Sequence, residues 1–158
     1  CGLLQINEGS ILVDKKEIGA IIEEPGFLKQ YSGKQNLRLL ASMSGKENID
    51  IEKVLKTVGL EHAGRKKVGK YSMGMRQRLG IAQAIMEKPE ILILDEPMNG
   101  LDKHGVKEIR EVLLQMKEEN RVILLSSHNP KDIDYLCDVV FEMDDGYLQE
   151  MNDAKEDK

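Results

Sequence analysis

Two uninterrupted runs of aliphatic residues constrain the fold of this chain more than any other feature. Residues 91–94 (Ile-Leu-Ile-Leu) and 122–125 (Val-Ile-Leu-Leu) each lead into polar residues, and apolar residues recur at helical spacing over 103–119 between them. Strands that are buried on both faces of a parallel sheet have such continuous apolar sequences. The order of strand, helix and strand therefore predicts an α/β fold, with a parallel sheet that helices cover on both faces.

The rest of the chain adds short strands and a helical middle. Residues 11–13 and 18–22 have the composition of strands around a polar turn. Between about 28 and 88, apolar residues recur at helical spacing, with Ser, Gly or Pro at the predicted helix ends. We expect one domain in which a helical subdomain is inserted into an α/β core. The α/β core is expected at 1–27 and 89–151, and its closing strands near 139–141 and 146–148. The helical subdomain is expected at 28–88, and a solvated tail at 152–158.

The composition narrows the classes of function. The chain has 158 residues, a formal net charge of -5 and a pI of about 5.3, which disfavours binding to nucleic acid. No apolar run approaches the roughly 18 residues of a membrane-spanning helix, so we expect no direct membrane insertion. Cys1 and Cys137 lie outside any CxxC pattern, which favours unpaired thiols.

An acid pair, Asp95-Glu96, follows the first aliphatic run and precedes Pro97. Ligands bind at the carboxyl ends of strands in open parallel sheets, and successive side chains there diverge. One carboxylate of such a pair can hold Mg²⁺, while the next can polarise an attacking water. A solvated turn after a buried strand is the simpler alternative for the same two residues.

Three further positions are candidates because of where they lie. Ser72 is placed to cap a helix, and Gly74 in its first turn leaves backbone N–H groups open, as at an anion site. His128 follows the second aliphatic run, where a histidine can hydrogen-bond a terminal phosphate. Asp102 precedes the helix at 103–119, so it is either a cap or a functional carboxylate. Taken alone, each of these residues more often has a structural role.

In combination, these elements resemble the ordered motifs of ABC-type ATPases. The resemblance covers nearly the whole chain, and the Glu-Glu-Pro-Gly-Phe sequence is similar to that of the bacitracin and lantibiotic resistance exporters. The matching segments are 18–27 (the Q-loop region), 72–75 (the signature, commonly Leu-Ser-Gly-Gly-Gln), 91–97 (Walker B), 99–102 (the D-loop) and His128 (the H-loop).

The resemblance implies a P-loop NTPase-like core, ATP and Mg²⁺ as cofactors, and a role for each motif residue. Asp95 and Glu23 would hold Mg²⁺, Glu96 would be the general base, and His128 would contact the γ-phosphate. Residues 72–75 (Ser72, Met73, Gly74 and Met75) would contact ATP bound by a second ATPase subunit, and Asp102 would communicate across that dimer. The helical subdomain would face a transmembrane permease, which places the protein in the cytoplasm on the inner face of the membrane.

The chain departs from the family pattern in three ways. Glu23 replaces the usual Q-loop Gln, which adds charge near phosphate, and Met75 replaces the signature Gln. No G-x-x-x-x-G-K-[ST] phosphate loop (Walker A) occurs in the sequence. We therefore expect a fragment that alone does not bind ATP tightly. Because the strand before that loop lies inside the sheet of this family, we also expect an exposed apolar sheet edge.

Two alternatives to a transport ATPase remain open. A catalytically incompetent module could lend its signature surface to a partner's ATP site. A non-transport ABC ATPase is the other alternative, although such proteins usually carry long coiled-coil inserts or tandem domains. Intact Asp95, Glu96 and His128 favour catalysis, and the helical subdomain of about 60 residues favours transport.

Overall fold

The computed structural model describes residues 7–13, 18–22, 26–46, 48–119 and 121–151. Among the described residues, three α-helices and a short 3-10 helix lie between the first and second strands, and strands and helices then alternate as far as β4. The elements are β1 (Ile18–Ile21), α1 (Gly33–Ser44), α2 (Ile51–Thr57), the short 3-10 helix η2 (Val68–Lys70), α3 (Met73–Ile85), β2 (Ile91–Asp95), α4 (Lys103–Glu118), β3 (Val122–Ser126), α5 (Pro130–Leu136), β4 (Val140–Asp144) and β5 (Tyr147–Met151).

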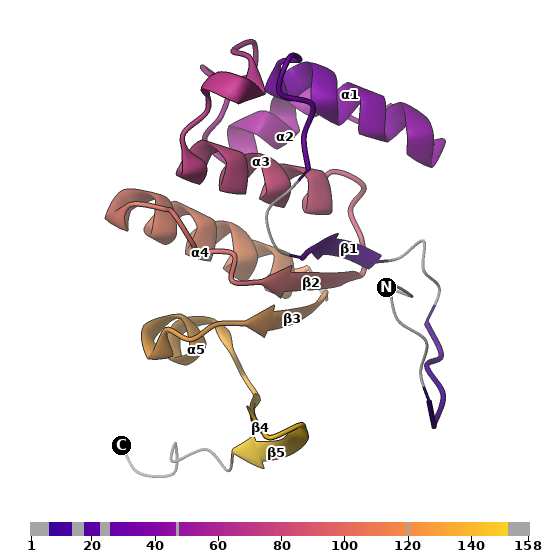
Figure 1. Cartoon of the computed structure of the whole chain (residues 1–158), viewed down its shortest axis with the longest axis vertical. Helices are drawn as coiled ribbons and strands as arrows, with labels where there is room; N and C mark the ends of the chain where they lie inside the picture. Colours follow the sequence, from indigo (N-terminus) through magenta and orange to yellow (C-terminus); the bar gives the residue numbers. More distant parts are fainter. Residues whose placement is uncertain (1–6, 14–17, 23–25, 47, 120, 152–158) are drawn as a thin grey trace.

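A parallel sheet in the order β1-β2-β3 lies at the centre of the molecule (Figure 1). Ile21, Leu94 and Leu125 share one row of its register. The predicted α/β fold with parallel strands is thus confirmed. Strands β4 and β5 pair antiparallel with each other in a separate two-stranded sheet. Figure 1 shows α1, α2 and α3 gathered at one end of the molecule and the β4-β5 pair at the other.

Only one face of the described part of the parallel sheet is buried. Leu92 and Leu94 are at most 1% exposed, whereas Val122 and Leu124 on the opposite face of β3 are 63% and 61% exposed. The prediction that helices cover both faces is therefore wrong for the described residues. Continuous aliphatic runs indicate strands, but they do not specify which segments cover them. Strand β3 is also an edge of the described sheet, in agreement with the expected exposed apolar edge.

Residues 11–13 form no strand, and that prediction was also wrong. Ile11 and Leu12 are 71% and 92% exposed. An apolar run becomes a strand only where a partner strand satisfies its backbone groups, and none of the described strands pairs with this segment.

Side-chain caps determine where α1, α2 and α3 begin, at the end of the molecule opposite the β4-β5 pair. Ser32 and Gln35 form a reciprocal capping box at the start of α1, and Asp50 and Ser72 cap α2 and α3. The predicted Ser72 cap is confirmed. The core of this end consists of fully buried aliphatic residues. They are Leu37, Leu55, Val58, Val68, Leu79 and Ile81.

Gly19 lets this helical end pack directly against the sheet. A Cβ atom at Gly19 would lie 2.1 Å from the carbonyl oxygen of Ala84 on α3, so any larger residue would separate β1 from that helix. The contact ties the start of the sheet to the helix that begins at Ser72. The signature segment and the strand ends therefore belong to one packed unit.

Candidate functional site

The carboxyl end of the sheet brings Asp95 beside Ser126. The two residues are register partners on β2 and β3, and the Ser126 hydroxyl donates a hydrogen bond to Asp95 Oδ1. The backbone N–H of Glu96 donates to the Ser126 carbonyl oxygen at 3.1 Å. Ser126 therefore fixes both members of the acid pair, a role that the sequence did not suggest.

Glu96 and His128 meet at this edge of the sheet, as strand ends predict. The backbone N–H of His128 donates to Glu96 Oε1 at 2.9 Å, and its Nδ1–H donates to the same oxygen at 2.7 Å. Within the described part of the chain, no group hydrogen-bonds to Glu96 Oε2, and the side chain is 28% exposed. One carboxylate oxygen is thus held in place while the other faces solvent, where it can accept a proton from water.

The backbone of Glu96 is anchored from two directions. Its φ of +46° lies in the left-handed region that is costly for a residue with a Cβ atom. The Gln77 side-chain amide donates to the Glu96 carbonyl at 3.3 Å, and the N–H of Asn99 donates to the same oxygen at 3.1 Å. Gln77 lies on α3, so the signature helix supports the conformation of the acidic residue. No local sequence pattern indicates this contact, because 19 residues separate the two positions.

The signature segment at 72–75 packs against the D-loop segment at 99–102. A Cβ atom at Gly74 would lie 2.8 Å from the Gly100 carbonyl oxygen, and Gly100 itself has a φ of +73° with the Met73 side chain above it. Asp102 caps α4 by accepting from the N–H of Gly105 at 2.8 Å. Ser72 is exposed, and Met73 remains 58% exposed although its side chain covers Gly100.

Asp95 is the metal-ligand candidate that the described residues offer. Glu23, the second predicted ligand, lies outside them. No group of three or more His, Cys, Asp or Glu side chains in the described ranges could hold a metal ion by itself. Magnesium bound with a nucleotide needs only one or two carboxylates, since water and phosphate supply the other ligands. The donor set therefore fits Mg²⁺ that arrives with a phosphate, and it does not fit a dedicated metal centre.

Arg78 joins three helices behind the signature segment, a role that no sequence pattern indicates. Its Nη1 donates to the Val58 carbonyl at the end of α2 at 2.8 Å, and its Nη2 donates to Glu108 Oε2 on α4 at 2.6 Å. The hydrogen bond from Arg78 is the main reason that the pKa of Glu108 lies below its ordinary value. Cβ atoms at Gly59 or Gly105 would lie 2.6 and 2.8 Å from the guanidinium, so these two glycines leave the space that it fills.

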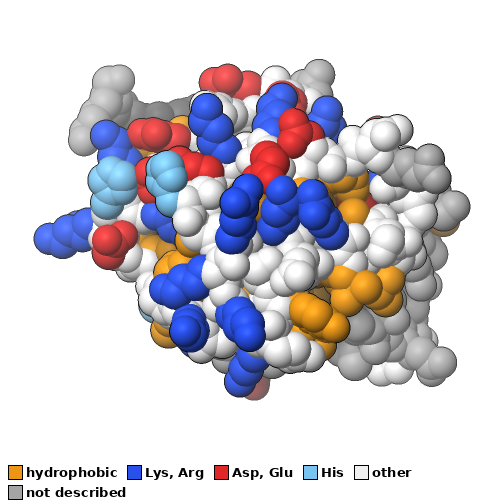
Figure 2. All heavy atoms as spheres, turned by 90° about the horizontal axis from the view of Figure 1, so that it is seen from above, with side chains coloured by type: hydrophobic (Ala, Val, Ile, Leu, Met, Phe, Trp, Pro, Cys, Tyr) orange, Lys and Arg blue, Asp and Glu red, His pale blue; other side chains and the backbone are white. Residues whose placement is uncertain are grey.

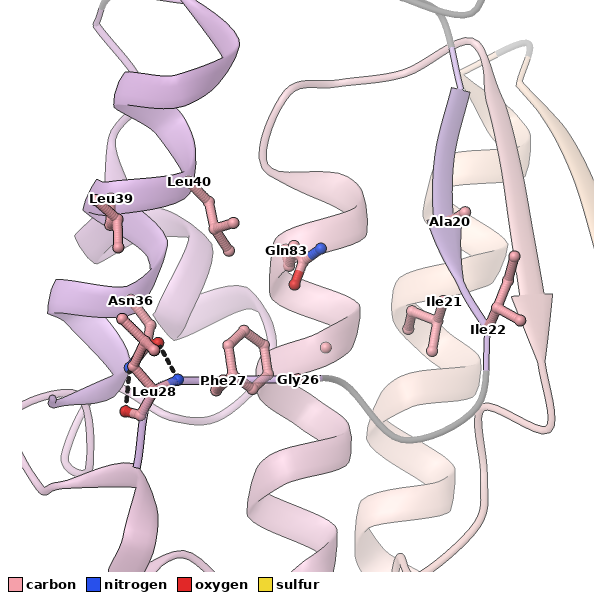
Figure 3. A pocket seen from close by; sticks show the side chains of 11 residues that line it. Ala20, Ile21, Ile22, Gly26, Phe27, Leu28, Asn36, Leu39, Leu40 and Gln83 are labelled. Atoms are coloured by element: carbon pink, nitrogen blue, oxygen red, sulfur yellow. Dashed lines mark hydrogen bonds between the residues drawn. The ribbon is translucent and has the colours of Figure 1, made fainter. Parts of the chain in front are cut away.

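A groove lies between α1 and β1 (Figure 3). Its cavity is about 270 Å³, with Leu39 and Leu40 of α1 on one side, Ala20 and Ile21 of β1 on the other, and Gln83 of α3 between them. A second cavity of about 320 Å³ shares Ala20, Leu40 and Gln83 and extends the groove along α1. Asn36 fixes one wall by pairing with both the N–H and the carbonyl of Leu28, at 2.8 and 3.1 Å.

Among the described residues, no helix has both the length and the apolar composition that a bilayer crossing requires. Many of the exposed apolar residues lie in the groove, at the open face of the sheet or on the β4-β5 pair, and residues 11–13 form a further exposed apolar segment. Exposed apolar surfaces of this kind are candidates for contact with other chains.

Comparison with known proteins agrees with the order and geometry of these motifs. The family described as "ABC transporter" matches residues 1–99. The bacitracin transport ATP-binding protein BcrA of Enterococcus faecalis is 47% identical over 136 residues, which cover 85% of this chain and 44% of that protein. The lantibiotic transport ATP-binding protein SrtF of Streptococcus pyogenes is 38% identical, over 88% of this chain and 64% of that protein.

A solved structure described as the ATP binding subunit of an ABC transporter has the same fold. It superposes with a TM-score of 0.76 at 25% identity, over 87% of this chain and 60% of that chain. The chain thus spans about half to two thirds of the length of the relatives it matches. The family match over most of the chain and the shared fold lead to one conclusion: this chain belongs to the ABC transporter family of ATP-binding proteins.

Proposed function

We propose that residues 1–158 form the catalytic-carboxylate and signature part of an ATP-hydrolysing subunit of an ABC exporter. The observation that carries the proposal is the geometry at the end of β2. Asp95, Glu96 and His128 meet at the carboxyl edge of a parallel sheet, where this fold class binds ligands. Ion pairing or a solvated turn would not require a strained Glu96 backbone supported from both α3 and β3.

In this proposal, Glu96 is the general base for an attacking water. The two hydrogen bonds from His128 hold Oε1, and Oε2 remains open to the water. The His128 imidazole lies 78% exposed beside this carboxylate, where it can also reach a terminal phosphate. Bound Mg-ATP would supply the phosphoryl group and the charge that stabilises its transfer, with Asp95 as a metal ligand. General-base catalysis of this kind contributes about 10²–10⁴-fold to the rate.

The phosphate cradle of the ATP site is proposed to come from sequence outside residues 1–158. A phosphate loop supplies backbone N–H groups and a lysine, and the sequence contains no such motif. We expect residues 1–158 alone to show no micromolar affinity for ATP in a titration with a fluorescent ATP analogue. Micromolar binding by this chain would contradict the proposed division of the site.

The exposed signature segment supports a second ATPase subunit as a partner. Ser72 is exposed beside the D-loop, and Met73 is 58% exposed although it also covers Gly100, so both can contact ATP held by another copy. The N-terminus of α3 adds backbone N–H groups and the positive end of a helix dipole to this surface. Met75 lies where the family pattern has a hydrogen-bonding Gln, and we propose that Ser72 and the backbone carry the contact.

The groove beside α1 supports a permease as the second partner. It is open, lined by aliphatic side chains together with Phe27, Asn36 and Gln83, and large enough for a few side chains of a docking helix. A subunit docked in this way would be peripheral, on the cytoplasmic face of the membrane. The relatives named for bacitracin and lantibiotic transport favour a peptide antibiotic as the exported substrate.

The proposal is tested by ATP hydrolysis in vesicles that contain the full-length subunit and its permease. The assay compares no addition, a bacitracin-class peptide and a lantibiotic-class peptide. We expect hydrolysis that one of these peptides stimulates. Absence of hydrolysis would contradict the catalytic assignment, whereas hydrolysis that neither peptide affects would contradict only the substrate class.

A further inference from the structure

Positive and negative charges are separated along this chain. The ranges 26–46 and 62–86 contain ten of its 23 Lys and Arg residues and none of its 28 Asp and Glu residues. Both ranges belong to the helical end of the molecule, around α1, η2 and α3. A chain with a net charge of -5 thus has one strongly basic end and an acidic remainder.

Four of these ten basic side chains are engaged within the fold. Lys34, Lys46 and Arg78 pair with carboxylates, and Arg76 donates to the Tyr71 carbonyl. The other six are exposed and have no ion-pair partner among the described residues. We call these six residues the basic face: Lys29, Arg38, Arg65, Lys66, Lys67 and Lys70.

Backbone contacts place the two segments of the basic face side by side. The N–H of Gly69 donates to the Lys29 carbonyl, and the N–H of Val68 donates to the Tyr31 carbonyl, both at 2.9 Å. An isolated antiparallel bridge joins Ser32 to Lys67. Figure 2 looks down onto this end of the molecule, and the lower half of the view shows Lys and Arg beside hydrophobic side chains with almost no Asp or Glu.

Exposed apolar side chains lie among these charges. Leu28, Tyr31 and Leu39 are 40%, 43% and 43% exposed, and they flank Lys29 and Arg38 in the sequence. A surface that mixes basic, aliphatic and aromatic side chains matches the boundary between lipid headgroups and acyl chains. A nucleic-acid backbone would use the charges but would leave the aliphatic side chains in water.

We propose that the basic face binds anionic lipid headgroups and holds the helical end of the molecule against the membrane. The acidic remainder of the chain is repelled by the same surface, so the charge separation also fixes the orientation. The proposal rests on the proposed function in one respect, namely that a permease partner places this subunit near a bilayer. The permease groove lies at the same end of the molecule, between α1 and β1, and shares Leu28 and Leu39 with the lipid-facing surface.

The test measures sedimentation of the full 158-residue chain with vesicles, without ATP or permease. One set of vesicles is phosphatidylcholine alone, and the other is an equal mixture with phosphatidylglycerol. Binding is expected only to the anionic vesicles and should weaken as salt is added. Each Lys or Arg near an anionic surface contributes about five-fold to partitioning, so the triple variant Lys66→Gln/Lys67→Gln/Lys70→Gln should lose on the order of 100-fold.

A matched variant removes the same charge elsewhere. Lys103→Gln/Lys107→Gln/Lys131→Gln changes exposed lysines on α4 and α5, and its partitioning should stay within about two-fold of the native chain. The proposal would be overturned if both variants lost binding equally or if the chain bound uncharged vesicles equally well. It would also be overturned if the chain did not bind anionic vesicles at low salt, or if duplex DNA displaced it from them. Because the assay contains no nucleotide, its failure would leave the ATPase proposal standing.

Discussion

Replacing Arg78 with methionine tests how the signature helix is joined to its neighbours. The Arg78 side chain is 13% exposed, and its guanidinium hydrogen-bonds the Val58 carbonyl at the end of α2 and the Glu108 carboxylate on α4. Methionine preserves most of the side-chain volume but offers no donor. The variant leaves the carbonyl of buried Val58 without its partner and removes one charge from the half-exposed pair with Glu108.

The two losses differ in size. A hydrogen bond from a charged donor to a partly buried carbonyl is worth about 2 kcal/mol. The pair with Glu108, whose side chain is 40% exposed, is screened by solvent and adds about 0.5 kcal/mol. We therefore expect Arg78→Met to lower the free energy of unfolding by about 2–3 kcal/mol in urea titrations of the full chain. Arg78→Lys, which can reach only one partner at a time, should lose about half as much.

The pH dependence of stability gives a second test of Arg78→Met. Since Arg78 lowers the pKa of Glu108 in the folded chain, this group stabilises the fold above its ordinary value of 4.5. The contribution is lost as the pH falls through the lowered folded-state pKa. The native chain should lose more stability than Arg78→Met when the pH is lowered from above 4.5 to below that folded-state value. Comparison of urea midpoints across this range measures the difference.

Arg38→Met is the matched control, because Arg38 is exposed on α1 and has no ion-pair partner among the described residues. Its unfolding free energy should stay within about 0.5 kcal/mol of the native value. If Arg78→Met also stays within that range, Arg78 does not join these helices in the way described.

Three other substitutions probe separate contacts. Asp132→Asn removes the charge of a 1% exposed carboxylate that accepts from Arg110 Nε at 2.9 Å, and it should cost about 3 kcal/mol of unfolding free energy in urea. Gly74→Ala places a Cβ atom 2.8 Å from the D-loop carbonyl, so ATP hydrolysis by the full-length subunit should fall at least about ten-fold; an unchanged rate would refute the close packing. Gln77→Met removes one of the two hydrogen bonds to the Glu96 carbonyl and leaves the one from Asn99, and it should lower kcat about ten-fold while KM for ATP stays constant.

The strands and long helices could be predicted because their signals are local. The aliphatic runs at 91–94 and 122–125 became β2 and β3, and the periodic pattern at 103–119 became α4. Residues 11–13 show the limit of that reasoning, since an apolar tripeptide does not specify a partner strand. Local sequence patterns likewise could not predict that only one face of the sheet is buried and that Leu124 is exposed, because burial depends on which distant segments pack there.

Part of the candidate site could be predicted, because the carboxyl ends of neighbouring parallel strands lie at the same edge of the sheet. That rule brought Glu96 and His128 together, and their hydrogen bonds agree with it. The supporting residues were not predictable, because Gln77 and Ser126 reach the acid pair across 19 and about 30 residues of sequence. The contact between the signature and the D-loop could have been suspected from Gly74, since a glycine at a helix start often permits close backbone approach.

The most direct test of the account is single-turnover ATP hydrolysis by the full-length subunit carrying Glu96→Gln. Glutamine keeps the shape of the side chain but cannot accept the proton of the attacking water. We predict that hydrolysis falls at least about 100-fold, while ATP affinity is unchanged. Hydrolysis within about three-fold of the native rate, with ATP bound normally, would contradict the assignment of Glu96 as the general base.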